Sequence, residues 1–178
     1  LLRAELARPA YRYELIALGA NTDPYQPIER EYRITRSILE VLAAYKNPVG
    51  IVTKSALIAR DIDILAPMAA QGLAKVALSV TTLDRKLARI MEPRAATPQR
   101  RLDTLRALSD AGIPTVVMTA PIIPALNDDE MESILAAAAD DDGHAEEEVL
   151  HAVLAGEPRG AGQHLLLVLE VALGHLDG

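Results

Sequence analysis

Residues 75–119, KVALSVTTLDRKLARIMEPRAATPQRRLDTLRALSDAGIPTVVMT, carry the pattern that decides the fold. A strand-sized apolar run from Lys75 to Val80 opens this stretch, and a second run from Ile113 to Thr119 closes it. Between the two runs, Thr97-Pro98 is a typical helix start and Ala111-Gly112 a typical helix end. A strand, a helical crossover and another strand predict two parallel strands joined by a right-handed connection.

The same alternation of strand and helix extends to both sides of this stretch. Strands are predicted at Tyr13 to Leu18 and at Val49 to Thr53, and helices at Ile28 to Tyr45 and at Ile62 to Gln71. One more helix, capped by Asn127 or Asp128, is predicted to end at Ala139. The repeats predict an α/β fold with a parallel sheet, arranged as half a barrel or as a doubly wound sheet. In both arrangements, functional residues collect in the loops at the carboxyl ends of the strands.

The composition narrows the class of protein. The chain has 178 residues, fewer than the roughly 200 to 250 of a complete eight-fold α/β barrel. It contains no cysteine, which excludes disulfides and thiolate metal sites within it. A formal charge of −7 argues against a generally basic nucleic-acid surface, although Arg89 to Arg106 is locally cationic. No run approaches the ~18 apolar residues of a membrane span and no signal peptide is recognisable, so we expect a cytoplasmic protein without a membrane partner.

Polar residues after the first two strands are candidates for ligand binding. Asn21, Thr22 and Asp23 precede a helix, whose free N–H groups can hold an anion or a carboxylate. Asp23 can instead accept a hydrogen bond from an ammonium group, and the same residues also form an ordinary turn before Pro24. Lys54 follows a buried strand, where it can pair with a ligand carboxylate, form a Schiff base if desolvated, or simply be solvated.

A second group of candidates follows the third predicted strand. Ser79 and Thr81 carry hydroxyls suited to a ribose or a carboxylate, although such residues end strands routinely. Further along, Glu92 is an acceptor for hydroxyls, and Arg94 offers a fork for a carboxylate or phosphate. The alternative for Glu92 and Arg94 is a surface ion pair between two helices.

The character of the chain changes after Ala139. Residues 140–178 contain acidic runs and the four histidines of the chain, which are His144, His151, His164 and His175. The spacing of these histidines matches no compact metal-ligand motif, so no metal site is predicted. We therefore divide the chain into a partial barrel at residues 1–139 and a divergent acidic, histidine-containing tail at residues 140–178, with one more strand or helix near its end.

Several motifs together resemble the radical SAM proteins related to spore photoproduct lyase. The most specific are NTDPYQPIE at residues 21–29 and MEPRAATPQRRL at residues 91–102, supported by IVTKSAL at residues 51–57 and APIIPALND at residues 120–128. The resemblance implies a partial TIM-type barrel of the radical SAM kind, with S-adenosylmethionine as cofactor. It also implies a four-iron four-sulfur cluster on a CxxxCxxC loop, which would lie upstream of Leu1 in a longer parent protein. There the cofactors generate a deoxyadenosyl radical that abstracts hydrogen from the substrate.

The resemblance assigns site residues around S-adenosylmethionine. The loop from Asn21 to Asp23 occupies the place of a motif that contacts the methionine amino end, and Lys54 matches a lysine near the methionine carboxylate. Ser79 and Thr81 match hydroxyls near the ribose or carboxylate. None of these residues is a proton-transfer catalyst in this interpretation, and the family suggests DNA or another macromolecule as the parent's substrate.

Glu92 and Arg94 are weaker candidates for polar support of the same ligand. Because no residue here can replace thiolate ligation to iron, we expect this chain alone to contribute only to S-adenosylmethionine binding. Two alternatives stay open. One is an aldolase-type barrel that uses Lys54 as a Schiff-base nucleophile. The other is a non-enzymatic or inert α/β fragment that self-associates through open sheet edges.

Overall fold

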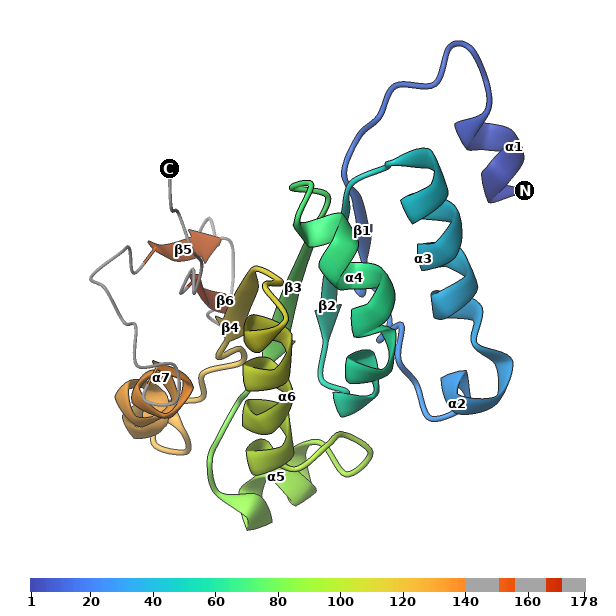
Figure 1. Cartoon of the computed structure of the whole chain (residues 1–178). Coiled ribbons are helices and arrows are strands. Elements are labelled where there is room, and N and C mark those ends of the chain that lie inside the picture. Colours follow the sequence, from blue (N-terminus) through green and yellow to red (C-terminus); the bar gives the residue numbers. More distant parts are fainter. Residues whose placement is uncertain (140–150, 156–165, 171–178) are drawn as a thin grey trace.

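The computed structural model describes residues 1–139, 151–155 and 166–170 of the chain. Its main sheet is parallel and has four strands in the order β1-β2-β3-β4. The strands are β1 (Ile16–Leu18), β2 (Val49–Thr53), β3 (Ala74–Ser79) and β4 (Thr115–Met118). Because the spatial order follows the chain order, each crossover adds the next strand on the same side, as in a segment of an α/β barrel (Figure 1). The predicted α/β class with parallel repeats is confirmed.

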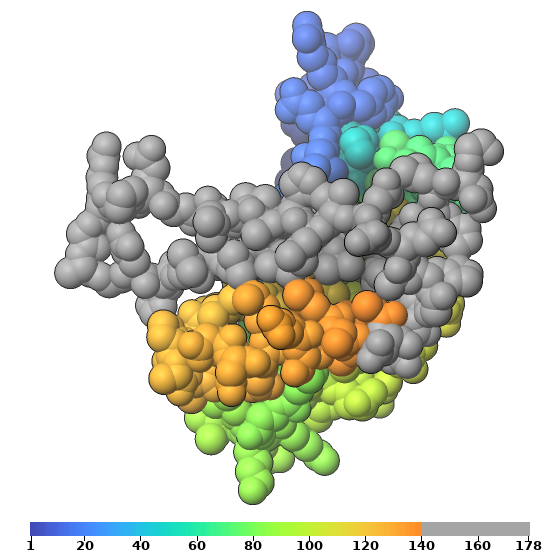
Figure 2. Space-filling view, turned by 90° about the vertical axis from the view of Figure 1, so that its left-hand side faces the viewer, coloured from blue at the N-terminus to red at the C-terminus, as the bar shows by residue number. Residues whose placement is uncertain are grey.

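Helices connect the strands and cover one face of the sheet (Figure 1). They are α1 (Leu2–Leu6), α2 (Glu29–Tyr32), α3 (Ile34–Tyr45), the 3-10 helix η1 (Ala56–Asp61), α4 (Ile62–Ala69), α5 (Arg85–Met91), α6 (Pro98–Asp110), the 3-10 helix η2 (Asp128–Glu130) and α7 (Met131–Ala139). In the space-filling view, the N-terminal segment projects from one end of the molecule and the green segment around α5 from the opposite end (Figure 2). Among the described residues, no helix has the length and apolar character needed to cross a bilayer.

Burial alternates along the central strands. Val49, Ile51 and Thr53 of β2 are buried, whereas Gly50 and Val52 between them are partly exposed. Val49 and Ile51 pack into one core with leucines of three helices: Leu39 and Leu42 of α3, Leu65 of α4, and Leu105 and Leu108 of α6. Successive side chains of a strand point to opposite faces, so the residues between the buried ones lie on the face turned away from the helices. Ser79, which shares its face with Lys75 and Ala77, belongs to that second face.

The single helix predicted from Ile28 to Tyr45 is wrong, because the structure has two helices with a break at Arg33. Arg33 adopts a left-handed conformation with φ of 51°. The buried carboxylate of Glu29 accepts hydrogen bonds from the backbone N–H groups of Ile34 and Thr35, both at 2.9 Å. Glu29 thereby satisfies the first free donors of α3 and starts a new helix inside the predicted one.

The structure also differs from the predictions at two helix caps and in the length of one strand. Helix α6 begins at Pro98 as predicted, but the Thr97 side chain forms no capping hydrogen bond. The predicted cap Asn127 does not cap α7, because its amide accepts from the N–H of Ile123 and donates to the carbonyl of Thr81. Strand β1 is shorter than predicted, since only Ile16 to Leu18 pair with β2.

The tail is described only in part. Two short strands, β5 (His151–Ala155) and β6 (Leu166–Glu170), form an antiparallel pair. The second of them agrees with the strand or helix predicted near the end of the chain. The other three histidines lie outside the described residues, so the predictions about metal binding and about the tail as a separate segment remain predictions.

Candidate functional site

The loop after β1 is fastened to the carboxyl end of β2 by Asp23. One oxygen of its carboxylate accepts from the Thr53 hydroxyl at 2.7 Å and from the backbone N–H of Tyr25 at 2.8 Å. The other oxygen accepts from the backbone N–H of Lys54 at 2.8 Å. Asp23 therefore positions the backbone from which the Lys54 side chain projects. This contact was not predicted, and it leaves the carboxylate little capacity for the ligand ammonium that the sequence suggested.

The two residues before Asp23 lie at the surface. Asn21 and Thr22 are exposed and line a cavity of about 320 Å³ beside β1. Thr35 and Ile38 of α3 form part of its wall. The structure thus places these two predicted site residues in an open hollow next to the strand edge, separate from the polar groups that surround Lys54.

Four side chains form a connected group, which we call the Lys54 cluster: Lys54 and Thr81, which follow β2 and β3, Glu92, which follows α5, and Arg101 of α6. The Lys54 ammonium lies 3.4 Å from Oε1 of Glu92. Oε2 of Glu92 accepts from the Arg101 guanidinium at 2.5 Å and from the Thr81 hydroxyl at 3.2 Å. Three predicted residues are therefore brought together, Lys54 and Thr81 from adjacent strand ends of the parallel sheet and Glu92 from the end of α5.

Arg101 is the member of the cluster that the sequence analysis missed. Its side chain is only 1% exposed, and it also donates to the carbonyl of Ala96 at 2.8 Å and to the carbonyl of Ser79 at 2.9 Å. The helical spacing could have predicted that Arg101 is buried. Arg101 lies four positions before Leu105 and seven before Leu108, so it shares their buried face of α6. A charged residue on the apolar face of a helix is usually paired.

Arg94 does not belong to this cluster. Its side chain is exposed, and within residues 1–139 no ion pair joins it to Glu92. The alternative of a surface ion pair between Glu92 and Arg94 is therefore wrong, because Glu92 turns inward to Lys54 and Arg101.

Ser79 presents an unsatisfied hydroxyl close to the Lys54 cluster. The residue is buried, and its Oγ has no hydrogen-bond partner among the described residues. Because its backbone carbonyl is bound by Arg101, the strand end that carries this hydroxyl is held by the cluster itself. A buried hydroxyl without a partner is costly, and the hydroxyls of Thr115 and Thr119 in and after β4 share this property.

The loops after β3 and β4 are tied to each other. The Thr82 hydroxyl and the backbone N–H of Leu83 each donate to the Glu130 carboxylate at 2.6 Å. The Asn127 side chain binds the carbonyl of Thr81 at 2.8 Å. These long-range contacts fix the loop that carries Thr81, and none of them was predicted.

Behind the site, the motif at residues 21–29 takes part in a buried ionic network. Asp61 is 0% exposed and accepts from Arg60 at 2.9 Å, from Arg36 at 3.0 Å and from the Tyr25 hydroxyl at 3.1 Å. Burial acts to raise the pKa of Asp61, but the hydrogen bonds from Arg60 and Arg36 outweigh it and hold that pKa below its ordinary value. Burial next to Asp61 raises the pKa of Tyr25 far above its usual range. The network joins the loop after β1 to η1.

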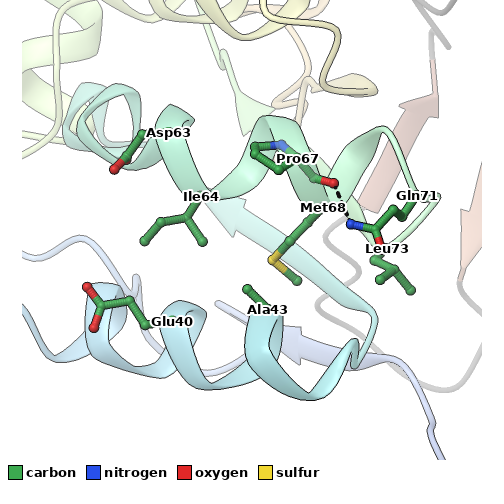
Figure 3. A pocket seen from close by; sticks show the side chains of 8 residues that line it. All are labelled: Glu40, Ala43, Asp63, Ile64, Pro67, Met68, Gln71 and Leu73. Carbon is green, nitrogen blue, oxygen red and sulfur yellow. Dashed lines mark hydrogen bonds between the residues drawn. The ribbon is translucent and has the colours of Figure 1, made fainter.

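A second hollow lies elsewhere, between α3 and α4 (Figure 3). It measures about 400 Å³ and has an apolar lining that includes Ile64, Met68 and Leu73, with Glu40 and Asp63 at one end. None of the predicted site residues lines it. Within the described part of the chain, no three His, Cys, Asp or Glu side chains are grouped so as to hold a metal ion.

Comparison with known proteins shows relatives for most of the described chain. Residues 2–138 match the family model of the Radical SAM superfamily. An uncharacterized protein of Mycobacterium tuberculosis is 43% identical over 128 residues, which are 72% of this chain and 38% of that protein. An uncharacterized protein of Methanocaldococcus jannaschii is 31% identical over 115 residues, which are 65% of this chain and 43% of that protein. The chain thus spans less than half the length of these relatives.

A similar solved structure is spore photoproduct lyase complexed with dinucleoside spore photoproduct. It superposes with a TM-score of 0.58 at 19% sequence identity, over 77% of this chain and 39% of that chain. At this identity the likeness concerns the fold, and it agrees with the predicted partial TIM-type barrel.

Proposed function

Because the chain belongs to the radical SAM superfamily, we propose that its strand-end loops contribute to a binding site for S-adenosylmethionine. The observation that carries the proposal is the pairing of two features at adjacent strand ends. Lys54 offers an ammonium on a side chain that is 41% exposed, and Ser79 offers a buried hydroxyl without a partner among the described residues. The ammonium suits the methionine carboxylate, and the hydroxyl suits either that carboxylate or the ribose.

When bound in such enzymes, S-adenosylmethionine is the source of a deoxyadenosyl radical, generated with an electron from a four-iron four-sulfur cluster. The cluster needs thiolate ligands, and the chain contains no cysteine, so the residues of this chain do not fit the cluster. We therefore assign to the chain the binding and orientation of the nucleotide, and to a longer parent protein the cleavage of S-adenosylmethionine. The match to less than half of each relative's length supports this division.

For the substrate of the parent we propose a nucleic acid. The proposal rests on the similar fold of spore photoproduct lyase, whose structure contains a dinucleoside spore photoproduct. An exposed cationic stretch in a chain of net charge −7 supports it. That stretch consists of Arg85, Lys86, Arg89, Arg94 and Arg100.

The Schiff-base alternative receives less support from the geometry. A Schiff-base lysine is desolvated, whereas the Lys54 side chain is 41% exposed and lies 3.4 Å from Oε1 of Glu92. Self-association through open sheet edges remains a prediction, which sedimentation at several concentrations would test.

Substitution of Lys54 by methionine is expected to weaken binding of S-adenosylmethionine to this chain by at least about tenfold, the effect of one lost charge-assisted contact. Affinity for methylthioadenosine, which lacks the amino-acid carboxylate, should not change. Isothermal titration calorimetry with both ligands measures the two effects.

The matched control is Lys46→Met, which removes the same charge from an exposed residue that precedes β2 at the opposite end of the sheet. It should leave both affinities unchanged. Equal losses of both ligands in the Lys54 variant, or no binding of either ligand by the wild-type chain, would contradict the proposed function.

Substitution of Ser79 by alanine should lower the affinity for S-adenosylmethionine without lowering the stability of the fold. Because the Ser79 hydroxyl is buried without a partner, its removal should leave the free energy of unfolding unchanged or raise it by about 1 kcal/mol. The affinity for S-adenosylmethionine should fall several-fold. Urea denaturation and calorimetry on the same variant test both halves, and a loss of stability with unchanged affinity would show that the hydroxyl serves the fold alone.

A further inference from the structure

We infer that Arg101 is a positioning residue that draws Glu92 away from Lys54 and so keeps the Lys54 ammonium available to a ligand carboxylate. The inference rests on the proposed nucleotide site and adds to it a residue that does not itself touch the ligand. It follows from three features of the Lys54 cluster: the unequal distances from Glu92 to the two cations, their unequal exposure, and the net charge of the group.

The distances show which cation holds Glu92. A charge-assisted hydrogen bond between nitrogen and oxygen is normally about 2.7 to 2.9 Å long. Glu92 lies 2.5 Å from Arg101 through Oε2 but 3.4 Å from Lys54 through Oε1. The carboxylate is therefore bound closely to Arg101 and only loosely to Lys54.

The exposure of the three groups explains this preference. The side chain of Arg101 is 1% exposed, that of Glu92 is 13% exposed and that of Lys54 is 41% exposed. A buried guanidinium that lost its carboxylate would be strongly destabilising, whereas a lysine at the surface is hydrated without a partner. Glu92 therefore stays paired with Arg101, because leaving the buried guanidinium unpaired would destabilise the fold.

The net positive charge of the Lys54 cluster is located on one residue, Lys54. Within the cluster two cations face one carboxylate, and the nitrogens of Arg101 are occupied by Glu92 and by the carbonyls of Ala96 and Ser79. The other carboxylate near Lys54, that of Asp23, accepts from the Lys54 backbone N–H and from Thr53 and Tyr25. The uncompensated positive charge consequently resides on Lys54, at the carboxyl end of β2. Without Arg101, Glu92 would be free to neutralise Lys54, and the site would present no net charge to an anion.

The experiment measures the affinities of two ligands and asks whether a second substitution restores the affinity lost through the first. Arg101→Met should weaken S-adenosylmethionine binding about tenfold more than methylthioadenosine binding, because only the former carries a carboxylate. Any loss through the Ser79 strand end, whose carbonyl Arg101 also binds, should be common to both ligands. Adding Glu92→Gln to Arg101→Met should restore S-adenosylmethionine affinity to within about threefold of the wild-type chain, since the competing charge is gone. Glu92→Gln alone should keep or increase that affinity.

The matched control is Arg100→Met, which removes the same charge from the neighbouring, exposed position of α6. It should change neither affinity. If Arg101→Met does not fold, Glu92→Gln alone still tests whether Glu92 competes with the ligand for Lys54, because it retains an amide that can bind Arg101 while it removes the competing charge.

Three results would overturn the inference. Equal weakening of both ligands by Arg101→Met would make Arg101 a purely structural residue. Failure of Glu92→Gln to restore binding in the double variant would show that Glu92 does not compete for Lys54. A tenfold loss in Glu92→Gln alone would make Glu92 itself a ligand contact.

If the wild-type chain binds neither nucleotide, the proposed function fails, and the positioning role is then tested on Lys54 alone. Free methionine, added as a carboxylate probe, should shift the lysine 13Cε NMR signal of Lys54 in the wild-type chain and in the double variant. It should not do so in Arg101→Met. The same response in all three proteins would overturn the inference independently of nucleotide binding.

Discussion

Substitution of Gly19 by alanine is expected to lower the free energy of unfolding by more than about 4 kcal/mol, which places it among the most damaging single changes. Gly19 follows β1 with φ of 101°, a conformation that side chains rarely adopt. A Cβ atom at this position would lie 2.1 Å from the carbonyl oxygen of Val52, so β1 and β2 would have to move apart. Urea denaturation followed by circular dichroism measures the loss.

Gly72→Ala is the matched control for this prediction. Gly72 also has a positive φ, of 69°, but a Cβ there would meet nothing within 4 Å. Its substitution should cost only the backbone strain of about 1 to 2 kcal/mol. Similar losses in the two variants would show that strain at Gly19, and not the close approach of the two strands, limits the side chain.

Substitution of Asp61 by asparagine is the second large effect that we expect, a loss of about 3 kcal/mol in the free energy of unfolding at neutral pH. Asp61 is the fully buried acceptor that Arg36, Arg60 and Tyr25 share. Its removal leaves buried donors and cationic charge without their common partner. The loop after β1, which carries Asp23, should become more mobile as a consequence.

The pH dependence of this loss follows from the direction of the pKa shift. The pKa of Asp61 is lowered in the folded chain, so its charge stabilises the fold above the pKa of the unfolded chain, and this contribution disappears as the pH falls through the lower, folded pKa. The difference in unfolding free energy between wild type and Asp61→Asn should therefore be constant near neutral pH and shrink below about pH 4. A difference that is unchanged in strong acid would contradict the assignment.

Asp63→Asn provides the matched control. Asp63 also binds Arg36, at 2.7 Å, but its side chain is exposed. Exposed ion pairs contribute little to stability, so this variant should unfold almost like the wild-type chain. A loss as large as that of Asp61→Asn would show that Arg36, and not the burial of Asp61, is responsible.

The candidate site was partly predictable because its residues follow strands. Lys54 and Thr81 are predictable as polar residues after strands, and Glu92 as a polar residue of a motif between two helices; the structure brings the three together. Asp23 was selected for the same reason, but it binds Thr53 and the backbone instead of facing open space. A short list of polar strand-end residues can thus be read from the chain, whereas their partners cannot.

Local patterns by themselves determined the succession of strands and helices, the parallel sheet and the family. Apolar runs, helix starts and turns are encoded in neighbouring residues, and specific motifs survive when the rest of the sequence diverges. Only the tertiary structure decided that Glu92 binds Arg101 and not Arg94. That choice depends on how α6 packs against the strand ends, which buries the guanidinium of Arg101 and makes an unpaired charge there too costly. The same long-range contact determines where the positive charge of the site appears.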